Sequence, residues 1–244
     1  MNRNQIKYIA IVAMLMDHIA HVFFKFFQNY SWGFALTFIF RFFGRITAPV
    51  MCWFLVQGFV HTSSRKNYAI RLLIFAAVAQ APYMLVRTDV SVFAGLNVIY
   101  TLLVSFLMLC VLESQLDALP KWVIIITLIA LSMLGDWAIF APVMVLFFYI
   151  FKDDRKRLLL FYSLAAASLV VTDIVILCIR HYYWWQELWQ LGMFLFIPLL
   201  LSYNGERGSA HPFHKWFFYV FYPLHLLVLW LIFYNGTCSF FLCI

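Results

Sequence analysis

Long runs of apolar residues, separated by short polar segments, account for most of this chain. The runs are continuous rather than alternating, which favours helices over strands with one polar face. A helix that crosses a bilayer needs roughly 17–25 mainly apolar residues. About nine transmembrane helices are therefore predicted, over residues 6–27, 35–60, 68–86, 96–112, 122–134, 138–151, 158–179, 187–202 and 216–234.

The fifth and sixth of these runs, residues 122–134 and 138–151, are short for a helix that crosses the whole bilayer. Gly135, Asp136 and Trp137 lie between them and are predicted to form a tight turn. The two helices are accordingly expected to be tilted or partly re-entrant.

Composition supports a membrane protein with no soluble domain. Hydrophobic residues make up 66% of the 244 residues and charged residues only 11%, whereas a soluble domain has roughly 25% charged residues. In lipid the backbone must satisfy its own hydrogen bonds, so the continuous runs predict an all-α polytopic bundle over residues 1–244, as a single transmembrane domain. The five cysteines show no metal-ligand spacing, so no metal site is expected.

The distribution of cations predicts the orientation. Most of the 17 lysines and arginines fall in the segments that are cytoplasmic if the N-terminus is cytoplasmic. The remaining cations are Lys25, Arg41, Arg45, Arg87 and Arg180. This bias places the N-terminus in the cytoplasm and the C-terminus outside. The net charge of +7 is thus a topology signal, and no nucleic-acid partner is expected.

Ionisable side chains within the predicted helices are the candidate functional residues, because charge in hydrocarbon is costly. Asp17 and His18 lie near the middle of the first helix, Arg45 at a comparable depth in the second, and His225 near the middle of the last. Asp17, Arg45 and His225, from three helices at one depth, predict a shared buried site, with an Asp17–Arg45 ion pair. A purely structural role for that pair remains an alternative.

One spacing links this site to the cytoplasmic side. Lys7 and His18 are eleven positions apart, so they share a helix face with a rise of about 16 Å between them. A ligand with phosphates at one end and a reactive group at the other would suit this arrangement, and acyl-CoA has that form. Lys7, or Arg71 at the next cytoplasmic segment, would bind phosphate.

Several motifs resemble those of TraX proteins, a family named for the conjugation-system enzyme that N-acetylates F-type pilin. The resemblance begins with residues 6–10 and 15–18 and continues through the segment from Gly44 to Pro49. It recurs in residues 67–71, 80–83 and 221–225. It implies a multi-pass protein of the bacterial inner membrane, with acetyl-CoA as acyl donor and a pilin or another envelope molecule as acceptor.

TraX proteins are in turn similar to the acyltransferase type 3 class of membrane acyltransferases. Lys7 and His18 match the basic residue and histidine with which that class opens, with lysine in place of arginine, and Gly44, Arg45 and Pro49 match its second helix. The resemblance implies cytoplasmic access for the acyl donor. A lysine binds phosphate less directionally than the guanidinium of arginine.

The predicted function is acetyl transfer from acetyl-CoA to an amine or hydroxyl. His18 is the expected general base. Asp17 pairs with Arg45 and shapes the site, or Arg45 stabilises the thioester oxyanion. His225 would form a second polar wall, with Tyr222 as a hydrogen-bond donor.

Two alternatives come from other functional classes. Buried Asp17, His18 and Arg45 are also typical of proton-coupled transporters, although no internal repeat of the kind seen in many carriers is visible. The same residues would also serve as interhelical bonds in a non-catalytic membrane component of a conjugation apparatus.

Overall fold

The computed structural model describes residues 1–244 except 88–94, 210 and 242–244, and only the backbone of 212, 215 and 235–241. The described residues are almost entirely helical, and their one extended pairing is a bridge between Leu96 and Gly135. The elements are α1 (Arg3–Val22), α2 (Phe24–Phe27), α3 (Gly33–Gly44), α4 (Thr47–His61), α5 (Arg65–Val86), α6 (Val98–Leu112), α7 (Ala118–Ser132), α8 (Phe140–Ile150), α9 (Arg155–Ile179), the 3₁₀ helix η1 (Trp184–Leu195), α10 (Phe196–Leu201) and α11 (Pro212–Phe241).

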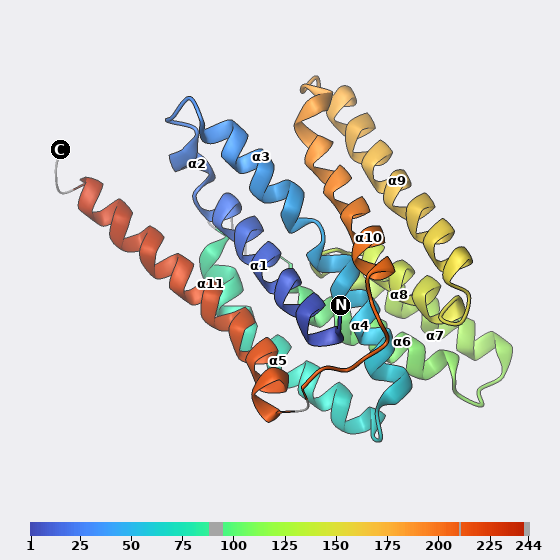
Figure 1. Ribbon diagram of the computed structural model, residues 1–244. Helices are drawn as coiled ribbons and strands as arrows, with labels where there is room; N and C mark the ends of the chain where they lie inside the picture. The colour runs from blue at the N-terminus through green and yellow to red at the C-terminus, as the bar shows by residue number, and fades with distance from the viewer. Residues whose placement is uncertain (88–94, 210, 242–244) are drawn as a thin grey trace. The chain divides into compact units, whose positions relative to one another are not determined.

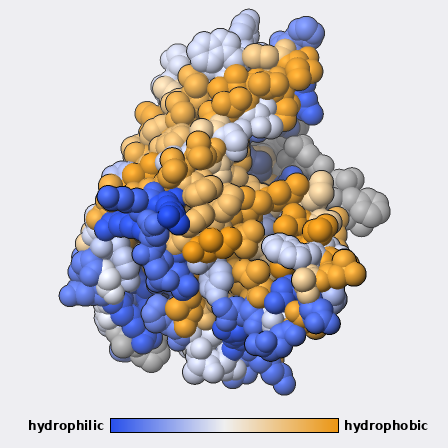
Figure 2. Space-filling view, turned by 90° about the vertical axis from the view of Figure 1, so that its right-hand side faces the viewer, coloured by the Kyte–Doolittle hydropathy of each residue, from blue (hydrophilic) through white to orange (hydrophobic). Residues whose placement is uncertain are grey.

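Every apolar run predicted from the sequence overlaps at least one of these helices. Four helical segments among the described residues are long and apolar enough to cross a membrane, namely Gly33–His61, Arg65–Val86, Arg155–Ile179 and Trp216–Tyr234. The helices α6, α7 and α8 are apolar but shorter. The face drawn in Figure 2 is largely hydrophobic, with hydrophilic side chains gathered mainly in its lower part. The chain is thus a helical membrane protein, whereas a total of nine crossings stays a prediction.

The chain forms two compact units, which are described separately. Unit 1 comprises Met1–Thr47, Ala81–Ala94 and Thr172–Ile244, and unit 2 comprises Ala48–Gln80 and Gly95–Val171. Both ends of the chain therefore belong to unit 1. The predicted site residues other than Arg71 also belong to this unit.

In unit 1, helix α1 packs between α3 and α11 (Figure 1). Helices α1 and α3 are antiparallel, because the hydroxyl of Thr47 donates to the carbonyl of Ala10 whereas Arg45 pairs with Asp17, further along α1. Helices α1 and α11 are parallel: Tyr8 contacts Phe217 near the start of both helices, and Phe23 contacts Phe233 further along.

The second predicted helix is interrupted, which corrects the expectation of one continuous helix over residues 35–60. Helix α3 ends at Gly44, Arg45 and Ile46 form a turn, and α4 begins at Thr47. Pro49 favours this break, because it has no backbone N–H and the carbonyl of Arg45 cannot accept the hydrogen bond that would continue the helix. The interruption therefore falls at the buried arginine.

The eighth predicted helix, over residues 187–202, is also not α-helical throughout. Trp184–Leu195 is a 3₁₀ helix, and α-helical structure resumes only in α10. Pro198 leaves the carbonyl of Phe194 without an α-helical partner, which favours a break there. This segment also approaches the backbone of α3 closely, because a Cβ atom on Gly192 would lie 1.7 Å from the carbonyl oxygen of Phe42.

In unit 2 the predicted turn between the fifth and sixth runs is confirmed. The amide of Asp136 donates to the carbonyl of Leu96 at 2.8 Å, and the Thr101 hydroxyl donates to the Asp136 carbonyl at 2.6 Å. Asn97 caps the start of α6 by accepting from the amide of Ile99, and its side-chain amide donates to the carbonyl of Ala76 in α5. These bonds fix the α7–α8 turn against the start of α6.

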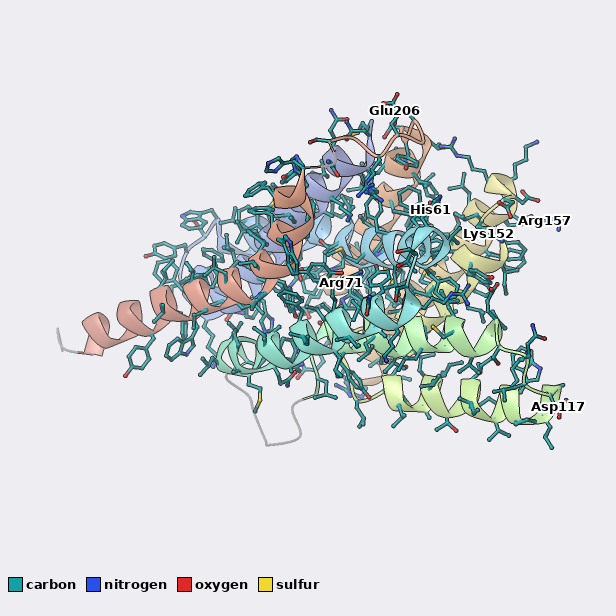
Figure 3. All side chains as sticks on the ribbon, turned by 90° about the horizontal axis from the view of Figure 1, so that it is seen from below. His61, Arg71, Asp117, Lys152, Arg157 and Glu206 are labelled. Atoms are coloured by element: carbon teal, nitrogen blue, oxygen red, sulfur yellow. The ribbon has the colours of Figure 1, made fainter. Side chains whose placement is uncertain are left out.

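The helix ends of unit 2 that lie away from the α7–α8 turn carry charged groups. Arg65, at the start of α5, pairs with Glu113 beside the end of α6 at 3.0 Å, and the hydroxyl of Tyr149 in α8 donates to the same glutamate. Figure 3 labels four further polar residues near the ends of α4, α7, α8 and α9 at this end, which are His61, Asp117, Lys152 and Arg157. The predicted orientation assigns this end of unit 2 to the cytoplasm.

Candidate functional site

The predicted ion pair between the first and second helical segments is present. Nη2 of Arg45 lies 2.5 Å from Oδ1 of Asp17, and the exposed fractions of the two side chains are 11% and 20%. Gly44 makes this approach possible, because a Cβ atom there would lie only 2.4 Å from Cβ of Asp17. The carboxylate and the guanidinium therefore meet where α3 ends and α1 passes closest to it.

A second polar pair joins α1 to α11. Nδ1 of His18 lies 2.6 Å from Nε2 of His225, and the two imidazole rings stack with their centroids 4.9 Å apart. His225 is buried, and its Nδ1 lies 2.8 Å from the carbonyl oxygen of Phe221. Tyr222 is also buried, with its ring centroid 5.7 Å from that of His225 and 6.3 Å from that of His18.

Adjacent residues of α1 thus connect it to two different helices. Asp17 contacts α3 through Arg45, and His18 contacts α11 through His225. The angular separation of about 100° between successive residues on a helix allows this. Polar groups from three helices are thus brought to α1 as two pairs on its neighbouring faces, whereas one shared site stays a prediction.

Lys7 lies on the same face of α1 as His18. Its Nζ lies 4.8 Å from the ring centroid of Phe218, so Lys7 also faces α11. Beside it, the hydroxyl of Tyr8 and Nδ1 of His214 form a hydrogen bond of 2.7 Å. The shared face expected from the spacing of Lys7 and His18 is confirmed, and one helix, α11, covers it.

Arg71, the other predicted phosphate-binding residue, belongs to unit 2. Its guanidinium carbon lies 5.3 Å from the ring centroid of Tyr68, one turn earlier in α5. Figure 3 shows where Arg71 lies on that helix. Its proposed part in binding an acyl donor stays a prediction.

Two features of unit 1 were not predicted from the sequence. The first is the direct bond between His18 and His225, whose only sequence signal is their common depth in the predicted helices. The second is a set of polar contacts outside these two pairs. Nδ1 of His21 lies 3.3 Å from Nη2 of Arg41, and the side-chain amide of Gln190 donates to Oδ2 of Asp173 at 2.9 Å. Among the residues that the structure describes, no group of three or more His, Cys, Asp or Glu side chains could hold a metal ion.

The arrangement supplies the elements of acid–base chemistry within the hydrophobic part of the protein. A neutral imidazole can accept a proton, and a second imidazole bonded to it fixes its orientation. The neighbouring guanidinium provides positive charge, which the carboxylate partly balances. These are the groups that a transfer reaction with a developing negative charge requires.

Comparison with known proteins identifies the family. The TraX protein family matches residues 2–233. A protein of Dichelobacter nodosus, described as probable fimbrial assembly protein FimC of serogroup H1, is 31% identical over 233 residues, which cover 92% of this chain and 93% of the relative. No solved structure matches the chain. Because the family match extends over nearly the whole sequence and includes both polar pairs, the chain belongs to the TraX protein family.

Proposed function

We propose that this TraX-family chain is an acetyltransferase of the bacterial cytoplasmic membrane that transfers an acyl group from acetyl-CoA to an acceptor amine or hydroxyl. The observation that carries the proposal is the His18–His225 pair, which lies next to the Asp17–Arg45 ion pair on α1. A partly buried imidazole held at 2.6 Å by a second imidazole is positioned as a general base.

The acyl donor approaches from the cytoplasmic end of α1. Lys7 binds phosphate of the nucleotide, and the thioester reaches His18, about 16 Å along an ideal helix. Both residues face α11, so the pantetheine arm would follow the α1–α11 face. Arg71 is a second phosphate-binding candidate, and Tyr222 contributes a hydroxyl near the imidazoles.

The transfer balances with these residues. His18 accepts the proton of the acceptor amine as the nitrogen attacks the thioester carbonyl carbon. Arg45 stabilises the negative charge that develops on the carbonyl oxygen, or Asp17 holds it solely to shape the site. The carbon–sulfur bond then breaks with its electron pair on sulfur, and the imidazolium of His18 returns the proton to give the free thiol.

The acceptor we propose is the N-terminal amine of a pilin. Two observations support this choice: the family is TraX, and the Dichelobacter nodosus relative is described as a probable fimbrial assembly protein. A protein acceptor anchored in the same membrane would present its amine at the level of the site without leaving the bilayer.

Removal of the imidazole tests the proposal directly. Purified His18→Ala protein, incubated with acetyl-CoA and a pilin carrying a free N-terminus, should lose about 10²- to 10⁴-fold in rate, the usual contribution of a general base. Mass spectrometry of the acceptor measures the acetylated fraction. His61→Ala is the matched control, because this exposed histidine lies in unit 2 and its ring bonds to the carbonyl of Gln57, one turn earlier in its own helix. Full activity of His18→Ala would end the assignment.

The interrupted helix at Arg45 favours a second candidate, a proton-coupled transporter. Broken helices beside buried charges are common at the substrate sites of secondary transporters. Thermal unfolding with and without CoA separates the two functions. An acetyltransferase should be stabilised by CoA, whereas a carrier, or a non-catalytic component of a pilus or conjugation apparatus, should not respond.

A further inference from the structure

The bond that His225 makes to its own helix fixes the position of one proton. Nδ1 of His225 lies 2.8 Å from the carbonyl oxygen of Phe221. A carbonyl oxygen can only accept, so Nδ1 must carry the hydrogen. In a neutral imidazole the other nitrogen is then an acceptor. Nε2 of His225 therefore presents a lone pair to α1.

That lone pair fixes the proton of the partner ring. Nε2 of His225 lies 2.6 Å from Nδ1 of His18, and a bond between them requires a hydrogen on Nδ1 of His18. The remaining nitrogen of a neutral His18, Nε2, is then unprotonated. In the described part of the chain no hydrogen bond is formed to Nε2 of His18.

We propose that His225 is a positioning residue that holds His18 in the tautomer whose Nε2 is the proton-accepting atom. In this arrangement Nδ1 of His225 donates to the carbonyl of Phe221, and Nδ1 of His18 donates to Nε2 of His225. The role in catalysis rests on the proposed acetyl transfer, whereas the tautomer itself does not.

The surroundings of His225 suit a fixed orienting group. Its ring stacks on that of Phe221 at a centroid distance of 4.7 Å and an interplanar angle of 10°. The side chain is only 6% exposed, so water competes little for Nε2. An isolated imidazole exchanges between two tautomers. The ring of His225 is instead held by its hydrogen bond to the carbonyl of Phe221 and by stacking on the ring of the same residue. His18 consequently meets an acceptor of fixed position.

The first test reads the tautomer without any activity assay. The nitrogen-15 NMR signals of His18 in histidine-labelled protein are assigned as those absent from the spectrum of His18→Gln. They should show Nδ1 of His18 protonated and Nε2 unprotonated. In His225→Leu, which cannot accept a hydrogen bond, His18 should lose this preference. A wild-type spectrum with the hydrogen on Nε2 of His18 would overturn the proposal, as would an unchanged His18 signal in His225→Leu.

The second test uses rescue. In the acetyl-transfer assay His225→Leu should lower kcat about 10- to 100-fold, the range typical of losing the hydrogen-bond partner that orients a metal-ligating imidazole, with little change in KM for acetyl-CoA. His225→Gln retains an oxygen that can accept from Nδ1 of His18 and should recover most of kcat. His214→Leu is the matched control, because it removes the Tyr8 bond between the same two helices.

The outcomes separate this inference from the proposed function. If wild-type protein does not acetylate any acceptor but shows the Nδ1–H tautomer of His18, the orienting role of His225 stands and the acetyltransferase proposal falls. If the protein is active and His225→Gln is as impaired as His225→Leu, acceptance of the hydrogen bond is not what His225 contributes, and the inference is wrong.

Discussion

Replacing Asp17 by asparagine leaves the guanidinium of Arg45 without its carboxylate at a site where both side chains are mostly buried. Their exposed fractions are 20% and 11%, and the distance between Oδ1 and Nη2 is 2.5 Å. Removal of one member of such a pair costs about 3–5 kcal/mol, because the other charge stays buried. We expect Asp17→Asn and Arg45→Gln each to lower the free energy of unfolding by this amount.

The double variant should be more stable than the sum of the two losses predicts. With both charges removed, no unbalanced charge remains, so the two changes should couple by about 1–3 kcal/mol. Equilibrium unfolding in mixed detergent–SDS micelles measures all four proteins. If the losses add to within about 0.5 kcal/mol, the two charges do not depend on one another and the ion pair does not stabilise unit 1.

The Arg65–Glu113 pair provides a matched control cycle. Its Nη2–Oε2 distance is 3.0 Å, but its side chains are 45% and 37% exposed. Solvent screening should limit the coupling between Arg65→Gln and Glu113→Gln to about 0.2–1 kcal/mol.

An acetylation assay of the Asp17→Asn/Arg45→Gln protein separates the two possible roles of the buried pair. A stable but inactive double variant indicates that the pair takes part in the reaction, and a stable and active one indicates a structural role.

Three further outcomes are expected. Gly44→Val should separate α1 from α3, because its Cβ would lie 2.4 Å from that of Asp17, and should lower the thermal unfolding temperature more than Gly58→Ala in unit 2, where the nearest atom is the hydroxyl end of Tyr68. Asn97→Ala should cost about 1–2 kcal/mol of unfolding free energy through loss of the helix cap; an unchanged value would refute the cap's importance. Lys7→Ala should raise KM for acetyl-CoA about tenfold or more, consistent with loss of a charged hydrogen bond, with kcat little changed; an unaltered KM would exclude Lys7 from donor binding.

The helical segments could be predicted because a bilayer requires long continuous apolar runs, and each predicted run overlaps a helix. The two interruptions were missed although proline marks both. Pro49 and Pro198 each remove one backbone donor, and many transmembrane helices tolerate this without breaking. What decides the outcome is the neighbourhood, such as the close contact of Gly192 with Phe42, and that is known only once the helices are packed.

For the candidate site, the depth of each residue within its predicted helix indicated which helices would bring polar residues together, but not how all of their side chains would pair. Asp17 and Arg45 could be paired in advance, because opposite charges in lipid must find each other. The choice of His225 as the partner of His18 depends on α11 lying parallel to α1, which no local pattern specifies. The proton order in the two rings depends in addition on one backbone carbonyl, that of Phe221.

The two imidazoles that meet in unit 1 are separated by 207 positions in the chain. During synthesis α1 emerges from the ribosome long before α11, so His18 is at first without the ring of His225. Helix α11 brings that ring. A nascent chain that has not yet reached His225 consequently contains His18 without its imidazole partner, and the pair can form only after α11 has been made.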